Sequence, residues 1–154
     1  MTYCIDTSAL MDAWVRWYPQ EIFPTLWNYL DHLIDDERLI SSEEVLGELE
    51  RKEGDSLYQW AKERASLFLP LDNAVQTRVI SIMGKHPRLV DGRTGKSHAD
   101  PFVIATAQVT QSALVTGEKA TGAISRPKIP DVCKDLNVHC IGFTELIREE
   151  KWRF

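Results

Sequence analysis

The sequence is poor in cysteine and has no long apolar run. Its three cysteines, Cys4, Cys133 and Cys140, are an odd number and too few to form a disulfide framework. No stretch approaches the roughly 18 consecutive apolar residues of a transmembrane helix, and no signal-peptide or lipidation pattern is present. We therefore expect a cytoplasmic protein without a membrane role.

Several common kinds of functional site are also missing. Residues 2–5 form a β-prone run that leads into Asp-Thr-Ser-Ala-Leu rather than a glycine-rich turn, so neither a P-loop nor a dinucleotide site is supported. The spacing of Cys133, His139 and Cys140 matches no tetrahedral zinc site. A haloacid-dehalogenase-type phosphatase needs a second aspartate at position 8, where this chain has Ser8. The acidic residues then become the main candidates for chemistry.

Length and charge set further limits. The chain has 154 residues, which suits a single domain over residues 1–154. With 44% apolar and 27% charged residues, its composition is globular rather than disordered. The net charge of −5 argues against binding nucleic acid through bulk charge, but it leaves room for a local basic patch.

Short β-prone runs alternate with helical periodicity along the chain. Strands are predicted over 2–5, 38–40, 113–116 and 138–141, with an edge strand or plain connector at 67–71. Helices are predicted over 9–17, 22–36, 42–52, 55–66, 72–83, 100–109, 129–136 and 144–150, and a loop over 84–97. This alternation favours an α/β sandwich with a parallel sheet, whose ligands collect at the carboxyl ends of the strands.

Four acidic residues lie at element boundaries on that edge of the sheet: Asp6, Glu48, Asp100 and Glu118. Carboxylates held close together repel one another, so such a cluster is stable mainly around a hard divalent cation. Mg²⁺ or Mn²⁺ is therefore expected, and such ions support phosphodiester hydrolysis.

Each of these residues also has an ordinary structural explanation. Asp6 and Asp100 are good helix N-caps, whereas Glu48 and Glu118 taken singly would be solvent-exposed charges. Glu48 is preferred to Glu44 as the ligand because it lies at the border of the apolar face of its helix. Only the joint pattern of the four residues favours a functional site.

Four segments together resemble the successive motifs of PIN-domain nucleases, and VapC-like toxins in particular. They are Tyr3 to Leu10 (YCIDTSAL), Val45 to Leu49 (VLGEL), Ala99 to Ala107 (ADPFVIATA) and Leu114 to Lys119 (LVTGEK). The segment from Lys128 to Ile141 resembles the family's closing helix and strand. The resemblance implies a three-layer α/β/α sandwich with a short, mostly parallel central sheet.

The resemblance also implies an activity and the residues that perform it. It indicates a metal-dependent endoribonuclease, typically the toxin of a toxin–antitoxin pair, with Asp6, Glu48, Asp100 and Glu118 as the acidic set. Ser8 and Thr116 would support this set by hydrogen bonding. The family more often has aspartate at the position of Glu118, followed by an aromatic residue that is missing here. Two alternatives stay open: Asp131 is the fourth ligand, or the fold is catalytically idle and binds protein or RNA without cutting.

Two further features indicate partners. Lys85, Arg88, Arg93 and Lys96 lie in a locally basic segment before Asp100, which either guides an RNA backbone or is an ordinary solvated loop. Aromatic residues crowd the first helical hairpin, where they form core or leave a groove for an antitoxin: Trp14, Trp17, Tyr18, Phe23, Trp27 and Tyr29. Family habit suggests a homodimer, although no interface is readable from the sequence.

Overall fold

A parallel sheet forms the centre of the molecule. The structure is a computed structural model that describes residues 1–52, 55–92, 94, 97–123 and 125–154. Within these residues the sheet has five strands in the order β3-β2-β1-β4-β5, and each pair of neighbouring strands is parallel. The strands are β1 (Tyr3–Ile5), β2 (Leu39–Ser42), β3 (Phe68–Leu69), β4 (Ala113–Val115) and β5 (Cys140–Ile141).

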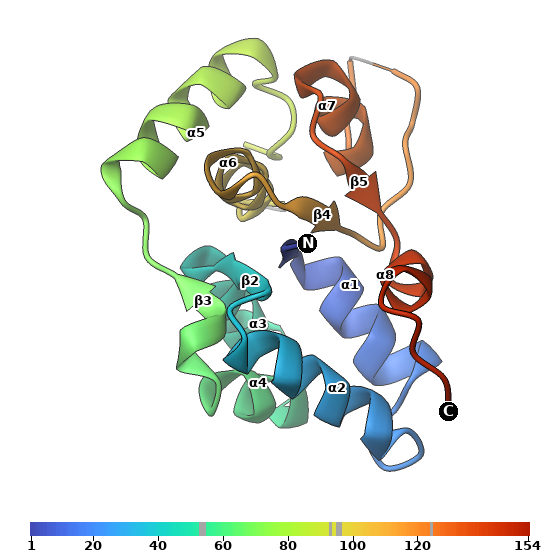
Figure 1. Cartoon of the computed structure of the whole chain (residues 1–154). Helices are drawn as coiled ribbons and strands as arrows, with labels where there is room; N and C mark the ends of the chain where they lie inside the picture. The colour runs from blue at the N-terminus through green and yellow to red at the C-terminus, as the bar shows by residue number, and fades with distance from the viewer. Residues whose placement is uncertain (53–54, 93, 95–96, 124) are drawn as a thin grey trace.

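Helices cover both faces of this sheet (Figure 1). On one face lie α5 (Asn73–Lys85), α6 (Asp100–Thr110) and α7 (Ile129–Leu136). The other face carries α1 (Thr7–Met11), the π-helical η1 (Asp12–Trp17), α2 (Pro24–Asp35), α3 (Glu43–Arg51), α4 (Asp55–Lys62) and α8 (Phe143–Glu149). A 3₁₀ turn, η2 (Ala65–Leu67), leads into β3. The predicted three-layer α/β/α sandwich is confirmed.

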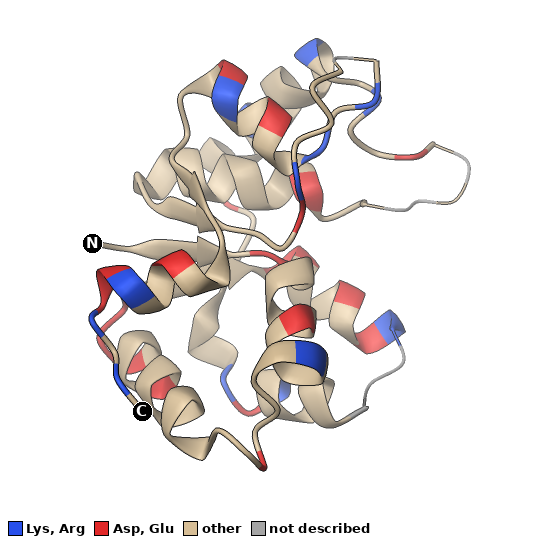
Figure 2. Ribbon diagram, turned by 90° about the vertical axis from the view of Figure 1, so that its right-hand side faces the viewer, with Lys and Arg blue, Asp and Glu red and all other residues tan. Residues whose placement is uncertain are grey.

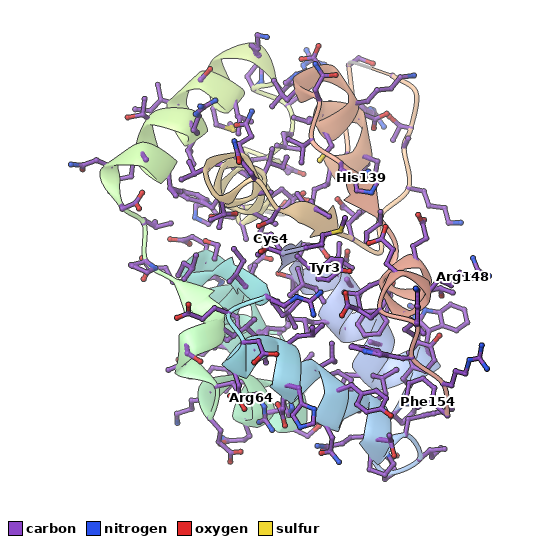
Figure 3. The ribbon with its side chains drawn as sticks, viewed as in Figure 1. Tyr3, Cys4, Arg64, His139, Arg148 and Phe154 are labelled. Carbon is purple, nitrogen blue, oxygen red and sulfur yellow. The ribbon has the colours of Figure 1, made fainter. Side chains whose placement is uncertain are left out.

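The central strand and one helix supply the middle of the core. Tyr3, Cys4 and Ile5 of β1 are fully buried, and Figure 3 shows Tyr3 and Cys4 in the middle of the molecule. Burial of every residue in a strand is expected for a parallel sheet that is covered on both faces. Helix α6 is buried over most of its surface, as its small and apolar residues predicted. The carboxyl ends of β1 and β4 are thus set in a rigid core.

Some predicted boundaries were wrong for identifiable reasons. The strand predicted from Val138 begins at Cys140, because Asn137 adopts a left-handed conformation and the Val138 N–H bonds to the Cys133 carbonyl to close α7. Helix α5 continues through Gly84 to Lys85. None of the described helices combines the length and the apolar character that crossing a bilayer requires.

Candidate metal and active site

Asp6 links the ends of two neighbouring strands. It follows β1 directly, and it caps α1 by accepting a hydrogen bond from the Ala9 N–H at 2.8 Å. Its Oδ2 also accepts hydrogen bonds from the hydroxyls of Ser8 at 2.9 Å and Thr116 at 2.7 Å. Because Thr116 follows β4, these bonds tie the carboxyl ends of β1 and β4 together. Ser8 and Thr116 thus donate hydrogen bonds to Asp6, in line with the supporting role that the resemblance implies for them.

The turn after Thr116 packs closely against α1. The Gly117 N–H donates to Ser8 Oγ at 2.9 Å, and the Glu118 N–H donates to Thr116 Oγ1 at 3.0 Å. A Cβ atom at position 117 would lie 2.4 Å from Asp12 Oδ2 and 3.3 Å from the Ser8 carbonyl. Only glycine permits this approach without displacing a neighbour, and the approach sets the position of Glu118.

Glu48 joins α3 to the starts of two other helices. Its side chain is buried, and Oε1 accepts a hydrogen bond from Thr7 Oγ1 at 2.5 Å. Oε2 accepts one from the Ala99 N–H at 3.4 Å. Glu44 is instead partly exposed and lies 3.5 Å from His98 Nε2. Glu48 therefore faces inward and Glu44 does not, whereas the preference for Glu48 as the ligand stays a prediction.

Asp100 does not cap its helix. The N-cap position of α6 is Ala99, and Asp100 is the first helical residue, so the ordinary explanation of Asp100 as an N-cap is wrong. Its carboxylate is about nine-tenths buried, and Ser97 donates a hydrogen bond to it. Asp100 Oδ2 is fully buried and has no hydrogen-bond partner among the described residues. A buried polar atom without a partner is costly, so it calls for a ligand or a proton.

The carboxylates act on one another electrostatically. Burial, together with the charges of Glu118, Asp6 and Glu48, raises the pKa of Asp100 to about 9, although the hydrogen bond from Ser97 opposes the shift. Burial also raises the pKa of Asp6 to about 7, assisted by Glu118 and opposed by the hydrogen bonds from Thr116, Ala9 and Ser8. The structure thus brings the four predicted acidic residues into one electrostatic neighbourhood at the carboxyl edge of the sheet.

Asp131, the alternative fourth ligand, accepts hydrogen bonds from the backbone. Its Oδ2 accepts hydrogen bonds from the N–H groups of Thr121 at 3.0 Å and Lys128 at 2.8 Å, and its Oδ1 accepts one from Gly122 at 3.0 Å. Burial tends to raise its pKa, but these hydrogen bonds together lower it. Asp131 therefore fastens the segment before α7 to that helix. Glu118 is the residue whose charge reaches Asp6 and Asp100.

The acidic set matches a hard divalent cation in its chemistry. Every side chain offers carboxylate oxygens, the carboxylates repel one another, and Asp100 Oδ2 is unpartnered among the described residues. Among the described residues, however, no group of three or more His, Cys, Asp or Glu side chains is arranged to hold a metal ion. Glu48 is bonded to Thr7 and Ala99, while Glu118 accepts from the Ile129 N–H at 3.3 Å and lies 3.9 Å from Lys128 Nζ.

Three residues of the site were missed by sequence reasoning. Thr7 bonds to Glu48, Ser97 bonds to Asp100, and Asp12 packs against Gly117. Thr7 had a signal, since it lies between Asp6 and Ser8 at the start of a helix. Asp12 is four residues after Ser8 on the same helix face, a weaker signal. Ser97 carried none, because its contact depends on the path of the preceding loop.

The structure describes the predicted aromatic hairpin in full and the predicted basic segment in part. Lys85 and Arg88 are exposed, whereas Arg93 and Lys96 lie outside the described residues. In the aromatic hairpin, Trp27 is buried, and its ring centroid lies 4.8 Å from that of Trp14. Trp17 is 63% exposed, Trp14, Tyr18 and Phe23 are half-buried against the core, and Tyr29 packs on Trp152 and Phe154. Most of these aromatic side chains thus belong to the core.

Comparison with known protein families assigns the chain to one of them. The model of the family described as "Domain of unknown function (DUF4411)" matches residues 3–154. The chain belongs to the DUF4411 family. Among solved structures, the crystal structure of FitAcB from Neisseria gonorrhoeae is similar, with a TM-score of 0.54 and 18% sequence identity over 91% of this chain and 96% of that one. A comparison with curated proteins finds no significant match. The structural similarity establishes that this DUF4411 protein has a PIN-like fold.

Proposed function

We propose that this DUF4411 protein is a Mg²⁺- or Mn²⁺-dependent endoribonuclease. The observation that carries the proposal is Asp100, a buried carboxylate with an unpartnered oxygen, whose pKa is raised by burial and by three neighbouring carboxylates. A structural role would leave this group satisfied, as it does for Asp131. A cation-binding role accounts for both its burial and its missing partner.

Four residues would hold the ion: Asp6, Glu48, Asp100 and Glu118. A divalent cation bound there supplies an activated water and stabilises the charge of the leaving oxygen in phosphodiester hydrolysis. Ser8 and Thr116 orient the Asp6 carboxylate, and Thr7 orients that of Glu48. In the cation-free protein, Asp100 carries a proton near neutral pH because its pKa is about 9. Asp100 would give up this proton in order to hold the ion.

The biological setting is also a proposal. The four motifs resemble those of VapC-like toxins, and the chain is similar in structure to FitAcB. These likenesses support a toxin–antitoxin pair in which the present chain is the toxin. The aromatic hairpin is the proposed antitoxin site, since Val15 and Ile22 at its tip are 63% and 66% exposed. Homodimer formation, cytoplasmic location and RNA guidance by the segment around Lys85 and Arg88 remain predictions.

A second function has its own support. Among the described residues, no three or more His, Cys, Asp or Glu side chains are arranged to hold a metal ion. Position 118 is glutamate, where the PIN-domain family more often has aspartate. Both observations favour a PIN fold that binds protein or RNA without cutting. Such a protein would bind without turnover at millimolar Mg²⁺ or Mn²⁺, and its expression alone would not slow growth.

Cleavage of a mixed pool of structured RNA separates the two functions. Purified protein is incubated with Mg²⁺, with Mn²⁺ and with chelator, alongside an Asp6→Asn variant. The nuclease proposal predicts cutting that requires metal and is lost in the variant, while circular dichroism shows that the variant is folded. Metal-dependent cutting by Asp6→Asn at the wild-type rate would contradict the proposed site.

A further inference from the structure

Two of the three cysteines lie against each other where α7 meets β5. Cys133 is in α7, and Cys140 is the first residue of β5, which packs against that helix. The two thiols interact through a side-chain hydrogen bond, although the residues are seven positions apart in the sequence. The proposed nuclease chemistry uses neither thiol.

The backbone holds this pair in place. The chain reverses at the end of α7, where the Val138 N–H donates to the Cys133 carbonyl at 2.9 Å. Just beyond the reversal, the Leu114 N–H donates to the carbonyl of His139, which is labelled at this junction in Figure 3, at 2.8 Å. This bond fixes Cys140 beside Leu114 of β4. Each thiol is therefore attached to a regular element with a hydrogen-bonded backbone.

The two thiols differ in their access to solvent. Cys133 is fully buried, whereas Cys140 is half-buried and lines a cleft of about 990 Å³ between η1, β5 and α8. The cleft has ample room for a small oxidant. Both signs of charge are interspersed over this side of the molecule (Figure 2), so no strong field of one sign keeps such a molecule away. A reagent from solvent therefore meets Cys140 before Cys133.

The hydrogen bond also makes the thiols unequal in acidity. The bond from Cys133 lowers the pKa of Cys140, although burial and the charges of Asp6, Glu145 and Glu118 oppose this shift. The same bond, together with burial, raises the pKa of Cys133. Because the thiolate is the reactive form of cysteine, acidity and access both favour Cys140 as the first thiol to react.

Cys4 provides a comparison within the same molecule. It is fully buried in β1, and its thiol donates to the Val103 carbonyl at 3.7 Å. Burial raises the pKa of this thiol well above its usual range. Cys4 should therefore stay reduced under conditions that oxidise an accessible thiol.

We propose that Cys133 and Cys140 are a peroxide-reactive pair that closes into a disulfide. The Cys140 thiolate attacks one oxygen of a hydroperoxide and the O–O bond breaks, which leaves Cys140 as a sulfenic acid. The other oxygen leaves as hydroxide or alkoxide and takes up the proton that Cys140 had lost.

The second step forms the disulfide. The Cys133 sulfur attacks the Cys140 sulfur, the S–O bond breaks, and the hydroxyl group leaves with the Cys133 proton as water. Together the two thiols lose two electrons, which the hydroperoxide gains. In a reducing compartment small thiols reopen such a bond, so the modification is reversible. This site is independent of the proposed nuclease function.

Peptide mapping of the wild-type protein tests the pair directly. The reduced full chain is treated with a small excess of hydrogen peroxide in chelator near neutral pH, then unfolded, alkylated and digested with trypsin. Cleavage after Lys134 places the two cysteines on peptides 129–134 and 135–148, while Cys4 lies on peptide 1–16. We expect mass spectrometry to find the first two peptides joined by a disulfide and peptide 1–16 fully alkylated. Two of the three thiols are thus lost, and dithiothreitol restores both.

Three variants, each checked for folding by circular dichroism, test the order of the steps. Cys133→Ala should stop at a sulfenic acid on Cys140, which dimedone traps. Cys140→Ala should leave Cys133 reduced at the same peroxide dose, because Cys133 is buried. Cys4→Ala, the matched change outside the pair, should give the same linked peptides as wild type.

Several results would overturn the pair. Full alkylation of Cys140, at a peroxide dose that oxidises most of the free cysteine in a parallel sample, would show that its thiol is not reactive. Two copies of peptide 135–148 joined to each other would show that Cys140 pairs between molecules instead. Oxidation of Cys133 in Cys140→Ala as fast as in wild type would contradict first attack by Cys140. Equal loss of the Cys4 thiol would mean that peroxide acts on an opened chain rather than on the folded pair.

Discussion

The first turns of α6 and α7 contain the same two residue types with opposite results. Each has a proline at its second position and an aspartate nearby, Asp100 in α6 and Asp131 in α7. Asp131 is the third residue of its helix and reaches back to the Lys128 N–H at 2.8 Å, so its charge is satisfied and its pKa is lowered. Asp100 is the first residue of its helix, makes no cap, and has a pKa raised to about 9.

This difference shows how a carboxylate of a functional site can be distinguished from one that only stabilises the fold. A two-residue change of position along a helix decides whether an aspartate meets backbone donors or other carboxylates. The hydrogen bonds of Asp131 stabilise the fold, whereas the buried carboxylate of Asp100 destabilises it. Such a cost to stability is common for residues that bind a ligand.

Replacing Asp100 should have the largest effect and should separate activity from stability. In Asp100→Asn we expect metal-dependent RNA cleavage to fall at least about 100-fold, because the buried oxygen available to the cation is lost. The melting temperature of the cation-free protein near pH 8 should rise, since a buried group that resists ionisation has been neutralised. Asp100→Asn that loses stability as well as activity would contradict this account of Asp100.

Replacing Thr116 tests the support for Asp6. Thr116→Val preserves the shape of the side chain but removes the donor at 2.7 Å to Asp6 and the acceptor for the Glu118 N–H. Mn²⁺ affinity should fall roughly 10- to 100-fold, as for other groups that orient a ligand. Titration calorimetry measures this affinity. Thr110→Val, which changes a threonine at the far end of α6, is the control and should bind as wild type does.

The pH dependence of stability should follow the raised pKa values. The folded protein retains protons on Asp6 up to about pH 7 and on Asp100 up to about pH 9, whereas the unfolded chain loses them near pH 3.8. Protonation therefore favours folding, and this stability is lost as the pH rises through the folded pKa values.

Melting curves of the cation-free protein check this sign. Each pKa unit corresponds to about 1.4 kcal/mol and each kcal/mol to about 2–4 °C, so we expect a fall of roughly 5 °C or more between about pH 5.5 and pH 8. Saturating Mn²⁺ should abolish most of this fall. A melting temperature that rises over the same pH range would be inconsistent with buried carboxylates whose pKa values are raised.

Replacing Asp131 should have the smallest effect. It should lower the stability of the protein and leave metal binding nearly unchanged, the opposite of what we expect for Asp100. Asp131→Ala removes the hydrogen bonds that join residues 121–128 to α7, and it should lower the free energy of unfolding by about 1–2 kcal/mol. Denaturant unfolding measures this loss. Mn²⁺ affinity should stay within a factor of a few, because Glu118 retains its place beside Ile129. Loss of affinity comparable to that of Asp100→Asn would make Asp131 a ligand.

Much of the fold was predictable because its signals are local. Helical periodicity identified α2 and α6, and the β-prone runs located β1 and β4. The ends of the elements were harder to predict. Strand β5 begins two residues after the predicted start because Asn137 and Val138 complete the C-cap of α7, and the apolar pattern of the sequence carries no signal for this backbone conformation.

The site divides in a similar way. The order of the acidic motifs along the chain predicted which carboxylates meet at the sheet edge. The hydrogen bonds of Glu118 and Asp131 were not predictable, because they depend on which backbone N–H groups the folded chain presents to each carboxylate.

The central claim is that the carboxylates around Asp100 hold a divalent cation. Mn²⁺ is titrated into cation-free protein near neutral pH, with proton release followed by an indicator dye, for wild type and Asp100→Asn. The account predicts saturable binding with release of protons, since Asp6 and Asp100 have pKa values of about 7 and 9, and much weaker binding with less release in the variant. No saturable binding by the wild type, or equal binding and release by both proteins, would contradict it.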